Sequence, residues 1–159
     1  MNTRWKPHVT VAAIIEREGR FLLVEEVAGD GLRLNNPAGH LEPGESPAQA
    51  CIRETLEETA HAFEPTALVG VYLSRQRKDA EDITYVRFAF CGELGDVDPV
   101  GRLDLGIVRI LWMTPDDIRQ SALRHRSPMV LQCMEDYLRG QRYPLELVAT
   151  HRSVAQHPG

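Results

Sequence analysis

Three glutamates, Glu54, Glu57 and Glu58, recur at helical spacing in the run RETLEE, residues 53–58. If that run is helical, positions i, i+3 and i+4 place the three carboxylates on one face. Neighbouring anions repel one another unless a positive charge lies between them. Mg²⁺ takes oxygen ligands and supplies that charge. The spacing therefore indicates a helix with a metal-binding face, reached through a turn-rich loop at residues 37–45 that carries two more acids.

Helix signals place this acidic run inside a longer helix. Ser46 is a good N-cap and Pro47 a good first helical residue, so the helix should run to about Thr59. The side opposite the glutamates is mostly apolar and is expected to face the core. Its members are Ala48, Ile52, Thr55, Leu56 and Thr59.

Strands are expected on both sides of this helix. Apolar and β-branched runs predict them at residues 8–16, 21–25, 32–36, 67–73, 84–94 and 107–113. The first two should pair as a hairpin across a turn. Thr114 begins a short helix, and Ser127 begins a helix of about 12 residues that Gly140 ends. This order predicts a mixed sheet with helices packed against it.

Composition narrows the class of protein. The 159 residues, 43% hydrophobic and 26% charged, fit one soluble domain over residues 1–148, with a flexible tail at 149–159. A net charge of −5 argues against broad binding of nucleic acid or anionic membranes. The three separated cysteines and the polar N-terminus fit a reduced, cytoplasmic protein. No apolar run approaches the roughly 18 residues of a membrane span.

The stretch from Gly39 through Glu45 to Glu58 resembles the Nudix box. That signature is a glycine, five residues, Glu, seven residues, Arg-Glu, an aliphatic residue, any residue, Glu-Glu, any residue, a second glycine and an aliphatic residue. Six of its fixed positions match here at the required spacing. The resemblance implies an α+β Nudix fold, with a mixed β-sheet sandwiched between α-helices (an α/β/α sandwich). It also implies hydrolysis of a diphosphate linkage by water, with Mg²⁺ bound or Mn²⁺ in its place.

The match to the box departs from the signature at three positions. Thr55 and His61 replace aliphatic residues, and Ala60 replaces the second glycine. These changes concern packing and the helix exit, whereas the carboxylates are intact. A left-handed alanine would cost about 1 kcal/mol relative to glycine. We therefore expect a slightly altered turn and unchanged chemistry.

Segments outside the box resemble the NudJ-type Nudix phosphatases of bacteria. They are residues 6–12, 37–42 and 140–146, and the likeness spans roughly residues 6–148. The resemblance implies release of orthophosphate from nucleoside tri- and diphosphates and from thiamine-pathway pyrophosphates. It leaves open whether pyrophosphate leaves instead, because attack at either phosphorus uses the same box.

The resemblance assigns metal ligands residue by residue. It carries them over to Glu54, Glu57 and Glu58, joined by a backbone carbonyl at Ala38 or Gly39. A bound metal neutralises phosphate charge and makes its water more acidic. Glu57 is the favoured general base, although the other glutamates remain candidates.

Further acids and one arginine are expected to support these ligands. Arg53 should pair with Glu57 across one turn, and Glu45 should steady the loop against the helix. A later loop is expected to add an acidic ligand. Asp104 is the first candidate, with Glu81 or Asp82 behind it.

Substrate contacts are predicted from charge and ring chemistry. The candidates are Arg4, Arg75, Arg87 and Tyr85, followed by Arg77, Lys78, Tyr72 and Tyr137. Each also has a structural interpretation, as a solvated loop residue, an ion pair or a packed ring. The expected partner is a small-molecule pyrophosphate bound by a monomer, without nucleic acid or membrane. The alternatives are a house-cleaning or RNA 5′-end pyrophosphohydrolase and a non-catalytic Nudix-fold sensor.

Overall fold

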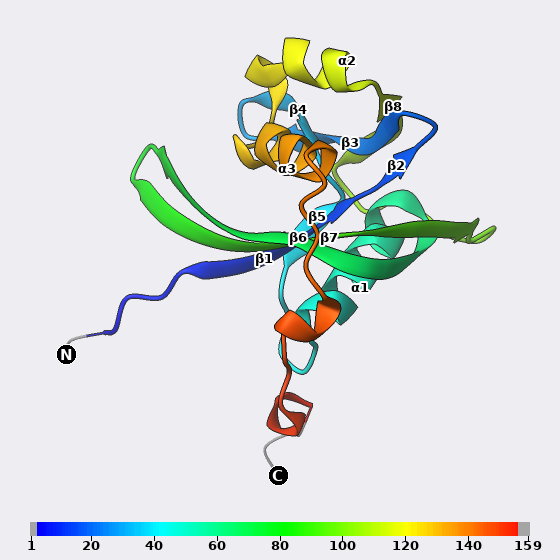
Figure 1. Cartoon of the computed structure of the whole chain (residues 1–159). Coiled ribbons are helices and arrows are strands. Elements are labelled where there is room, and N and C mark those ends of the chain that lie inside the picture. Colours follow the sequence, from blue (N-terminus) through cyan, green and yellow to red (C-terminus); the bar gives the residue numbers. More distant parts are fainter. Residues whose placement is uncertain (1–2, 156–159) are drawn as a thin grey trace.

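Two four-stranded sheets form the centre of the computed structural model, which describes residues 3–155 (Figure 1). The first sheet has the order β5 (Ala38–His40), β1 (His8–Ile14), β7 (Glu81–Val97), β6 (His61–Lys78). In it β1 runs parallel to β7, whereas the other pairs are antiparallel. The second sheet has the order β2 (Glu16–Arg17), β3 (Arg20–Ala28), β4 (Gly31–Asn35), and β8 (Ile107–Met113) also pairs with β3. The mixed sheet expected from the sequence is confirmed.

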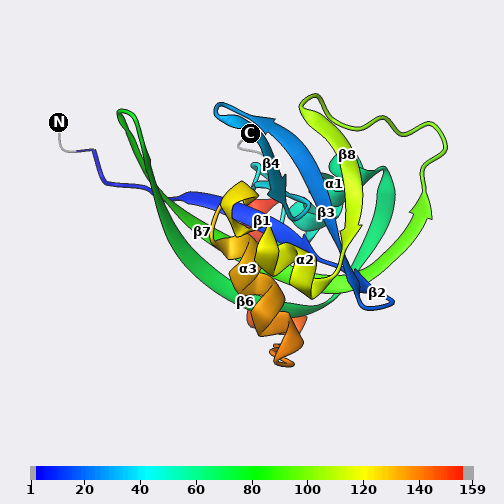
Figure 2. The ribbon, with the colours of Figure 1, turned by 90° about the horizontal axis from the view of Figure 1, so that it is seen from above.

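Helices cover both sides of these sheets. α1 (Pro47–Thr59) lies on one side, and α2 (Pro115–Gln120) with α3 (Met129–Leu138) lies on the other (Figures 1 and 2). Short 3₁₀ turns add η1 (Ala122–Arg124), η2 (Leu145–Leu147) and η3 (Arg152–Val154). This arrangement agrees with the predicted α+β Nudix fold. Among the described residues, no helix is long and apolar enough to span a bilayer.

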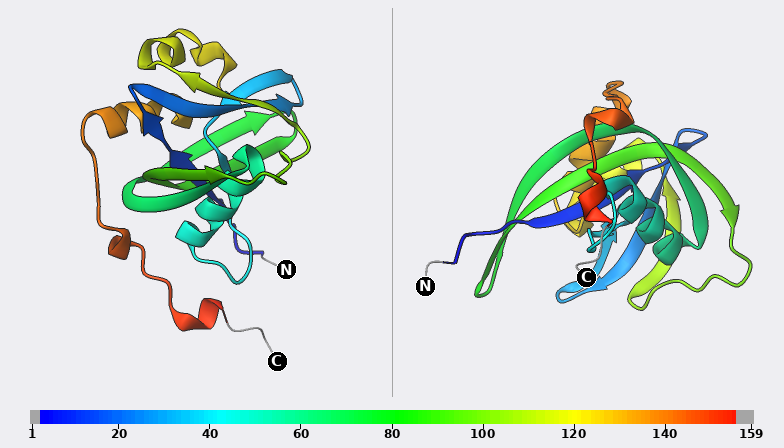
Figure 3. Two further views of the ribbon diagram at one scale, coloured as in Figure 1. Left: turned by 90° about the vertical axis from the view of Figure 1, so that its right-hand side faces the viewer. Right: turned by 90° about the horizontal axis from the view of Figure 1, so that it is seen from below.

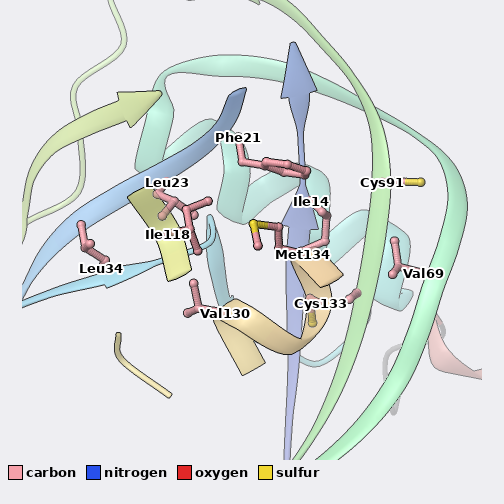
Figure 4. Close-up of a cluster of buried hydrophobic side chains, with 11 residues drawn as sticks. Ile14, Phe21, Leu23, Leu34, Val69, Cys91, Ile118, Val130, Cys133 and Met134 are labelled. Atoms are coloured by element: carbon pink, nitrogen blue, oxygen red, sulfur yellow. The ribbon is translucent and has the colours of Figure 1, made fainter. Parts of the chain in front are cut away.

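Two buried clusters hold the layers together. The first, shown in Figure 4, joins α2 and α3 to both sheets through residues such as Phe21, Leu34 and Met134. The second contains Ala50 and Cys51 of α1 together with residues from strands of both sheets. Because burying each large apolar side chain contributes about 1.5–3 kcal/mol, these contacts fix the orientation of α1.

Two strands extend well beyond their predicted ends. β6 and β7 reach past residues 67–73 and 84–94 because their polar ends pair with one another rather than with a core. Cross-strand pairing of Arg75 with Thr84, and the adjacent Arg75–Asp82 ion pair, support this ribbon, which Figure 2 shows as a long curved arm. Because these strand ends are stabilised by polar cross-strand contacts, their sequences lack the apolar pattern from which the strands were predicted.

The predicted N-terminal hairpin is only partly correct. β3 pairs with β2 and with β8, whereas β1 belongs to the other sheet. The chain changes sheets at Ile15, whose carbonyl still accepts from Leu22 N at 2.9 Å. A continuous apolar run does not reveal such a change, because it fits a strand in either sheet.

The buried side of α1 differs from the expected one. Ile52 and Leu56 are 38% and 42% exposed, whereas Thr55, Thr59 and Glu58 are buried. Each threonine hydroxyl donates to the carbonyl four residues earlier, so neither is left without a partner. The helix is therefore rotated so that one glutamate points inward rather than into solvent.

Ala60 shows that the helix exit keeps its left-handed turn. Its φ is 58° and its ψ 23°, and its N–H donates to Leu56 O at 2.8 Å. The slightly altered turn expected at this position is therefore wrong, because alanine adopts the conformation that glycine would take.

Ala60→Gly should stabilise the protein. Glycine removes the left-handed strain, and part of this gain is offset by the greater freedom of the unfolded chain. The net expected gain is about 0.5–1 kcal/mol in the free energy of unfolding. Urea unfolding at an unchanged m-value measures it, and a loss of stability would contradict this account of the turn.

The C-terminal segment leaves the body of the protein after η2 (Figure 3). Residues 149–155 are exposed and include η3, and residues 156–159 lie outside the described part. The flexibility predicted for residues 149–159 stays a prediction.

Candidate active site

The Glu54 carboxylate of α1 lies directly against Gly39 of β5. A Cβ placed on Gly39 would lie 2.0 Å from Glu54 Cδ and 2.1 and 2.3 Å from its two carboxylate oxygens. Two carbon atoms cannot lie that close without displacement. Only glycine at this position therefore lets the Glu54 carboxylate rest against the β5 backbone.

Glu58 lies beside Glu54 and contacts the neighbouring backbone of β5. Its Oε2 accepts from Ala38 N at 3.1 Å, and the side chain is buried. Burial, helped by the charges of Glu26, Glu54 and Asp104, raises the pKa of Glu58 to about 9 despite that hydrogen bond. Burial also raises the pKa of Glu54. The metal-free site therefore disfavours the charged forms of both carboxylates, and a cation bound beside them would favour those forms.

Strand alternation distinguishes the carbonyls of Ala38 and Gly39. Hydrogen bonds from Ala13 N to Pro37 O and from Leu41 N to Val9 O bracket Gly39. Antiparallel alternation therefore directs the Gly39 backbone groups toward β1 and those of Ala38 away from it. Because the Ala38 N–H already reaches Glu58, its carbonyl points to the same side. Of the two carbonyls suggested by the sequence, the geometry favours Ala38.

Arg53 connects the loop to the acidic face. Its guanidinium donates to Glu45 at 2.7 and 3.0 Å, to Glu54 at 2.9 Å and to Glu57 at 3.1 Å. It also donates to His40 O at 3.0 Å. The Glu57 contact is the i, i+4 pair expected from the sequence, and Glu45 ties the loop to α1 through the same guanidinium. Arg53 thus positions two of the candidate ligands.

Two acids from other elements lie near these glutamates. Asp104 is exposed, its N–H donates to Glu57 O at 3.0 Å, and its charge contributes to the raised pKa of Glu54. Glu26 of β3 adds to the raised pKa of Glu58, and burial raises its own pKa. The sequence analysis missed Glu26. In the sequence, Glu26 is only an acid that follows an apolar strand, and this pattern does not reveal that its side chain lies near α1.

The donor set fits a divalent cation in its chemistry. The groups near Gly39 are carboxylate and carbonyl oxygens, which are the ligands that Mg²⁺ prefers, and a bound cation reduces the repulsion between the carboxylates. Within residues 3–155, no three His, Cys, Asp or Glu side chains converge closely enough to hold a metal ion as they stand. Glu54 and Glu57 instead share the Arg53 guanidinium. The candidate ligands are therefore neighbours on α1, and Arg53 holds the carboxylates of Glu54 and Glu57.

A hollow runs from Ala38 and Gly39 between the two sheets, and we call it the inner hollow. It is bounded by β1, β3, β4, β6 and β7 and by the turn before α3. Its lining residues are Thr10, Glu26, Asn35, Ala38, Gly39, His40, Ser74, Gln76, Tyr85, Arg87, Arg126 and Ser127. The inner hollow therefore opens directly from the acidic site.

Only two of the four main substrate candidates line the inner hollow. Tyr85 packs edge-on against His8, with ring centroids 5.7 Å apart. Arg87 is buried and donates to Asn36 Oδ1 at 3.2 Å and Asn35 Oδ1 at 3.4 Å. Because both acceptors are neutral amides, they leave the Arg87 charge available to an anion.

The structure does not bring Arg75 or Arg4 to the inner hollow. Arg75 pairs with Asp82 at 2.5 Å, and strand alternation turns it to the sheet face opposite Ser74 and Gln76. Arg4 lies in the exposed N-terminal arm.

The remaining candidates make structural contacts. Tyr72 donates to Asp136 at 2.8 Å, and Tyr137 packs edge-on against Phe21 at 5.4 Å. The substrate candidates Arg77 and Lys78 and the metal-ligand candidates Glu81 and Asp82 lie at the tip of the β6–β7 hairpin. Asp82 pairs with Arg75 and Arg77 there, away from the acidic face of α1.

Comparisons with known proteins agree with this fold. The NUDIX domain model matches residues 6–132. Phosphatase NudJ of Escherichia coli (strain K12) is 37% identical over 144 residues, covering 91% of this chain and 92% of that protein. A NUDIX hydrolase structure from Nitrosomonas europaea is 50% identical, with a TM-score of 0.86 over 92% of this chain and 98% of its own.

A more distant structure shares the fold alone. The MutT NUDIX hydrolase from Burkholderia pseudomallei is 22% identical and has a TM-score of 0.66. It covers 83% of this chain and 98% of its own.

The chain therefore belongs to the Nudix family and is a hydrolase that acts on phosphorus-containing anhydrides. Nudix hydrolases generally use divalent metals and act on small molecules. It is homologous to the NudJ phosphatases along nearly its whole length.

Proposed function

We propose that this hydrolase releases orthophosphate from nucleoside tri- and diphosphates, with Mg²⁺ bound at the acidic face of α1. Thiamine-pathway pyrophosphates form a second proposed substrate class. The observation that carries the proposal is the approach of Glu54 to Gly39 beside the Glu58–Ala38 contact, at the mouth of the inner hollow. The likeness to Phosphatase NudJ supports the choice of orthophosphate.

The proposed metal ligands are Glu54, Glu57, Glu58 and the Ala38 carbonyl, with Asp104 supporting them. When bound, a divalent cation neutralises phosphate charge and lowers the pKa of its water. Mn²⁺ is expected to substitute for Mg²⁺, because both accept oxygen ligands.

The chain's own residues bind and orient the substrate. Arg87, buried and hydrogen-bonded to the neutral amides of Asn35 and Asn36, attracts a phosphate into the inner hollow, and Tyr85 forms part of its wall. Glu57, half-buried and held by Arg53, is the proposed acceptor of the proton from the attacking water. Glu45 keeps Arg53 in place from the loop side. Together they hold the phosphorus near the acidic face.

An assay of several candidate substrates distinguishes this proposal from the alternative functions named in the sequence analysis. Purified protein with Mg²⁺ is incubated with nucleoside tri- and diphosphates and thiamine pyrophosphate, and orthophosphate and pyrophosphate are measured separately. Orthophosphate from several substrates is expected. Pyrophosphate from a single nucleotide would instead indicate a house-cleaning enzyme. If no substrate released orthophosphate or pyrophosphate, the result would contradict the proposal and favour the RNA 5′-end or sensor alternatives.

Location and assembly follow from the sequence expectations. We propose a cytoplasmic monomer, and the three buried, unpaired cysteines are compatible with a reducing compartment.

A further inference from the structure

Arg126, which the sequence analysis did not single out, lies where three hollows meet. It lines the inner hollow together with Gln76. The same two residues line a charged hollow toward the hairpin tips and a more apolar hollow toward α3. A ligand that extends from the inner hollow into either outer hollow therefore passes the Arg126 side chain.

The backbone of Arg126 is held firmly. Its N–H donates to Leu34 O of β4 at 2.8 Å, and the preceding His125 forms a bridge with Leu34. On its other side, Ser127 Oγ accepts from Met129 N at the start of α3. The turn is thus fixed between a strand and a helix, so the position of the Arg126 Cα does not depend on its guanidinium.

The guanidinium of Arg126, in contrast, makes only a loose ion pair and no side-chain hydrogen bond within the described residues. Its nearest acid in the described structure is Glu26, with 3.7 Å between Nε and Oε1, and its side chain is 47% exposed. That distance exceeds the range of a hydrogen bond. Arg124, two residues earlier, instead hydrogen-bonds to Glu25, which also binds Arg109. Arg124 is therefore held in a hydrogen-bonded ion pair, whereas the longer Arg126–Glu26 pair leaves the N–H groups of Arg126 able to bind a ligand.

The charges of Glu26 and Arg126 indicate that this ligand is a phosphate group. A phosphate entering the inner hollow comes close to Glu26, which lines the same space and repels it. Arg126 offsets that repulsion, and its planar fork matches two phosphate oxygens. Because Arg126 and Gln76 also border the outer hollows, the guanidinium lies along the path of the substrate away from the metal ligands.

We propose that Arg126 is a specificity-determining residue that binds a phosphate group of the substrate other than the one attacked by water. This inference rests on the proposed function, since it names a contact made by the same substrates. Arg126 contributes to affinity in the ground state and the transition state alike, so its loss raises KM and leaves kcat nearly unchanged.

Two substitutions test this role against a matched control. Arg126→Gln should raise KM for a nucleoside triphosphate roughly tenfold, with kcat within about threefold of the starting protein. Arg126→Lys keeps the charge without the fork and should give an intermediate KM. Arg119→Gln removes the same charge on α2, where Arg119 pairs with Asp116 and Glu135, and should change neither constant. A fall in kcat at unchanged KM for Arg126→Gln would overturn the proposal.

A binding experiment separates this inference from the proposed function. The probe is a nucleoside diphosphate whose phosphates are joined by a methylene group, so that it binds without being cleaved. The unmodified protein should bind it roughly tenfold more tightly than Arg126→Gln, at low ionic strength and with Mg²⁺ present. Equal binding by both, or binding by neither, would overturn the role of Arg126. Tighter binding of the probe by the unmodified protein, combined with no phosphate release from the natural nucleotides, would instead contradict only the proposed function.

Discussion

Glu58→Gln is expected to reduce turnover by roughly 10²-fold or more, because it removes a charged ligand while it preserves shape. The glutamine oxygen still accepts the hydrogen bond from Ala38 N, so the fold should persist. Affinity for Mg²⁺ should fall together with turnover. Steady-state kinetics over a Mg²⁺ series measure both effects. Unchanged turnover would show that Glu58 is not a ligand.

Stability should respond to Glu58→Gln in the opposite direction. The folded protein raises the pKa of Glu58 from 4.5 to about 9, so it binds that proton more tightly than the unfolded chain does. The resulting stabilisation is fully present below about pH 4.5 and is lost as the pH rises toward 9. Glutamine does not titrate. In metal-free protein at pH 8, the variant should therefore unfold at a higher temperature than the unmodified protein, and an equal or lower Tm would contradict the cost of burying the charged Glu58 carboxylate.

Gly39→Ala is expected to lower turnover by roughly 10²-fold, because its methyl group would occupy the space of the Glu54 carboxylate. The methyl carbon would lie 2.0 Å from Glu54 Cδ, so the carboxylate must move away from β5. Mg²⁺ affinity should fall as well, since Glu54 is a proposed ligand. Kinetics and calorimetric titration with Mg²⁺ measure the two effects.

Gly29→Ala is the matched control for this substitution. A Cβ at Gly29 meets only the flexible end of Lys78, at 3.4 Å. Neither Gly29 nor Gly39 has a positive φ, so both substitutions add one methyl group without left-handed strain. Gly29→Ala should keep its turnover within about twofold. Similar losses in both variants would mean that the close contact with Glu54 is irrelevant.

The sequence predicted α1 and its ends because local chemistry determines them. Ser46 accepts from Gln49 N, and Pro47 begins the helix, so the boundary depends on adjacent residues. The mixed sheet and the family were also predictable, since the box fixes six positions at set spacings. The burial of Ile52 and Leu56 was wrongly predicted, because the strands that α1 packs against (β1, β5, β6 and β7) are distant in sequence, and the helix pattern alone does not reveal which side they cover.

The wider site depends on contacts between distant segments. Glu26 and Arg126 are separated by a hundred residues in the chain yet line one hollow, because β4 binds both β3 and the turn before α3. Arg75 and Arg87 look alike in the sequence, but strand alternation places them on opposite sheet faces. Assigning such residues requires the register of β6 and β7, which their polar ends do not reveal.

The measurement that tests the central claim most directly is orthophosphate release from a nucleoside diphosphate before and after removal of divalent cations. If the acidic face of α1 acts through a bound metal, chelation should abolish release and added Mg²⁺ should restore it. Glu58→Gln, assayed in parallel, should need more Mg²⁺ and recover only a small fraction of the rate. Release that persists in chelator at an unchanged rate would contradict the metal site at Glu54, Glu57 and Glu58.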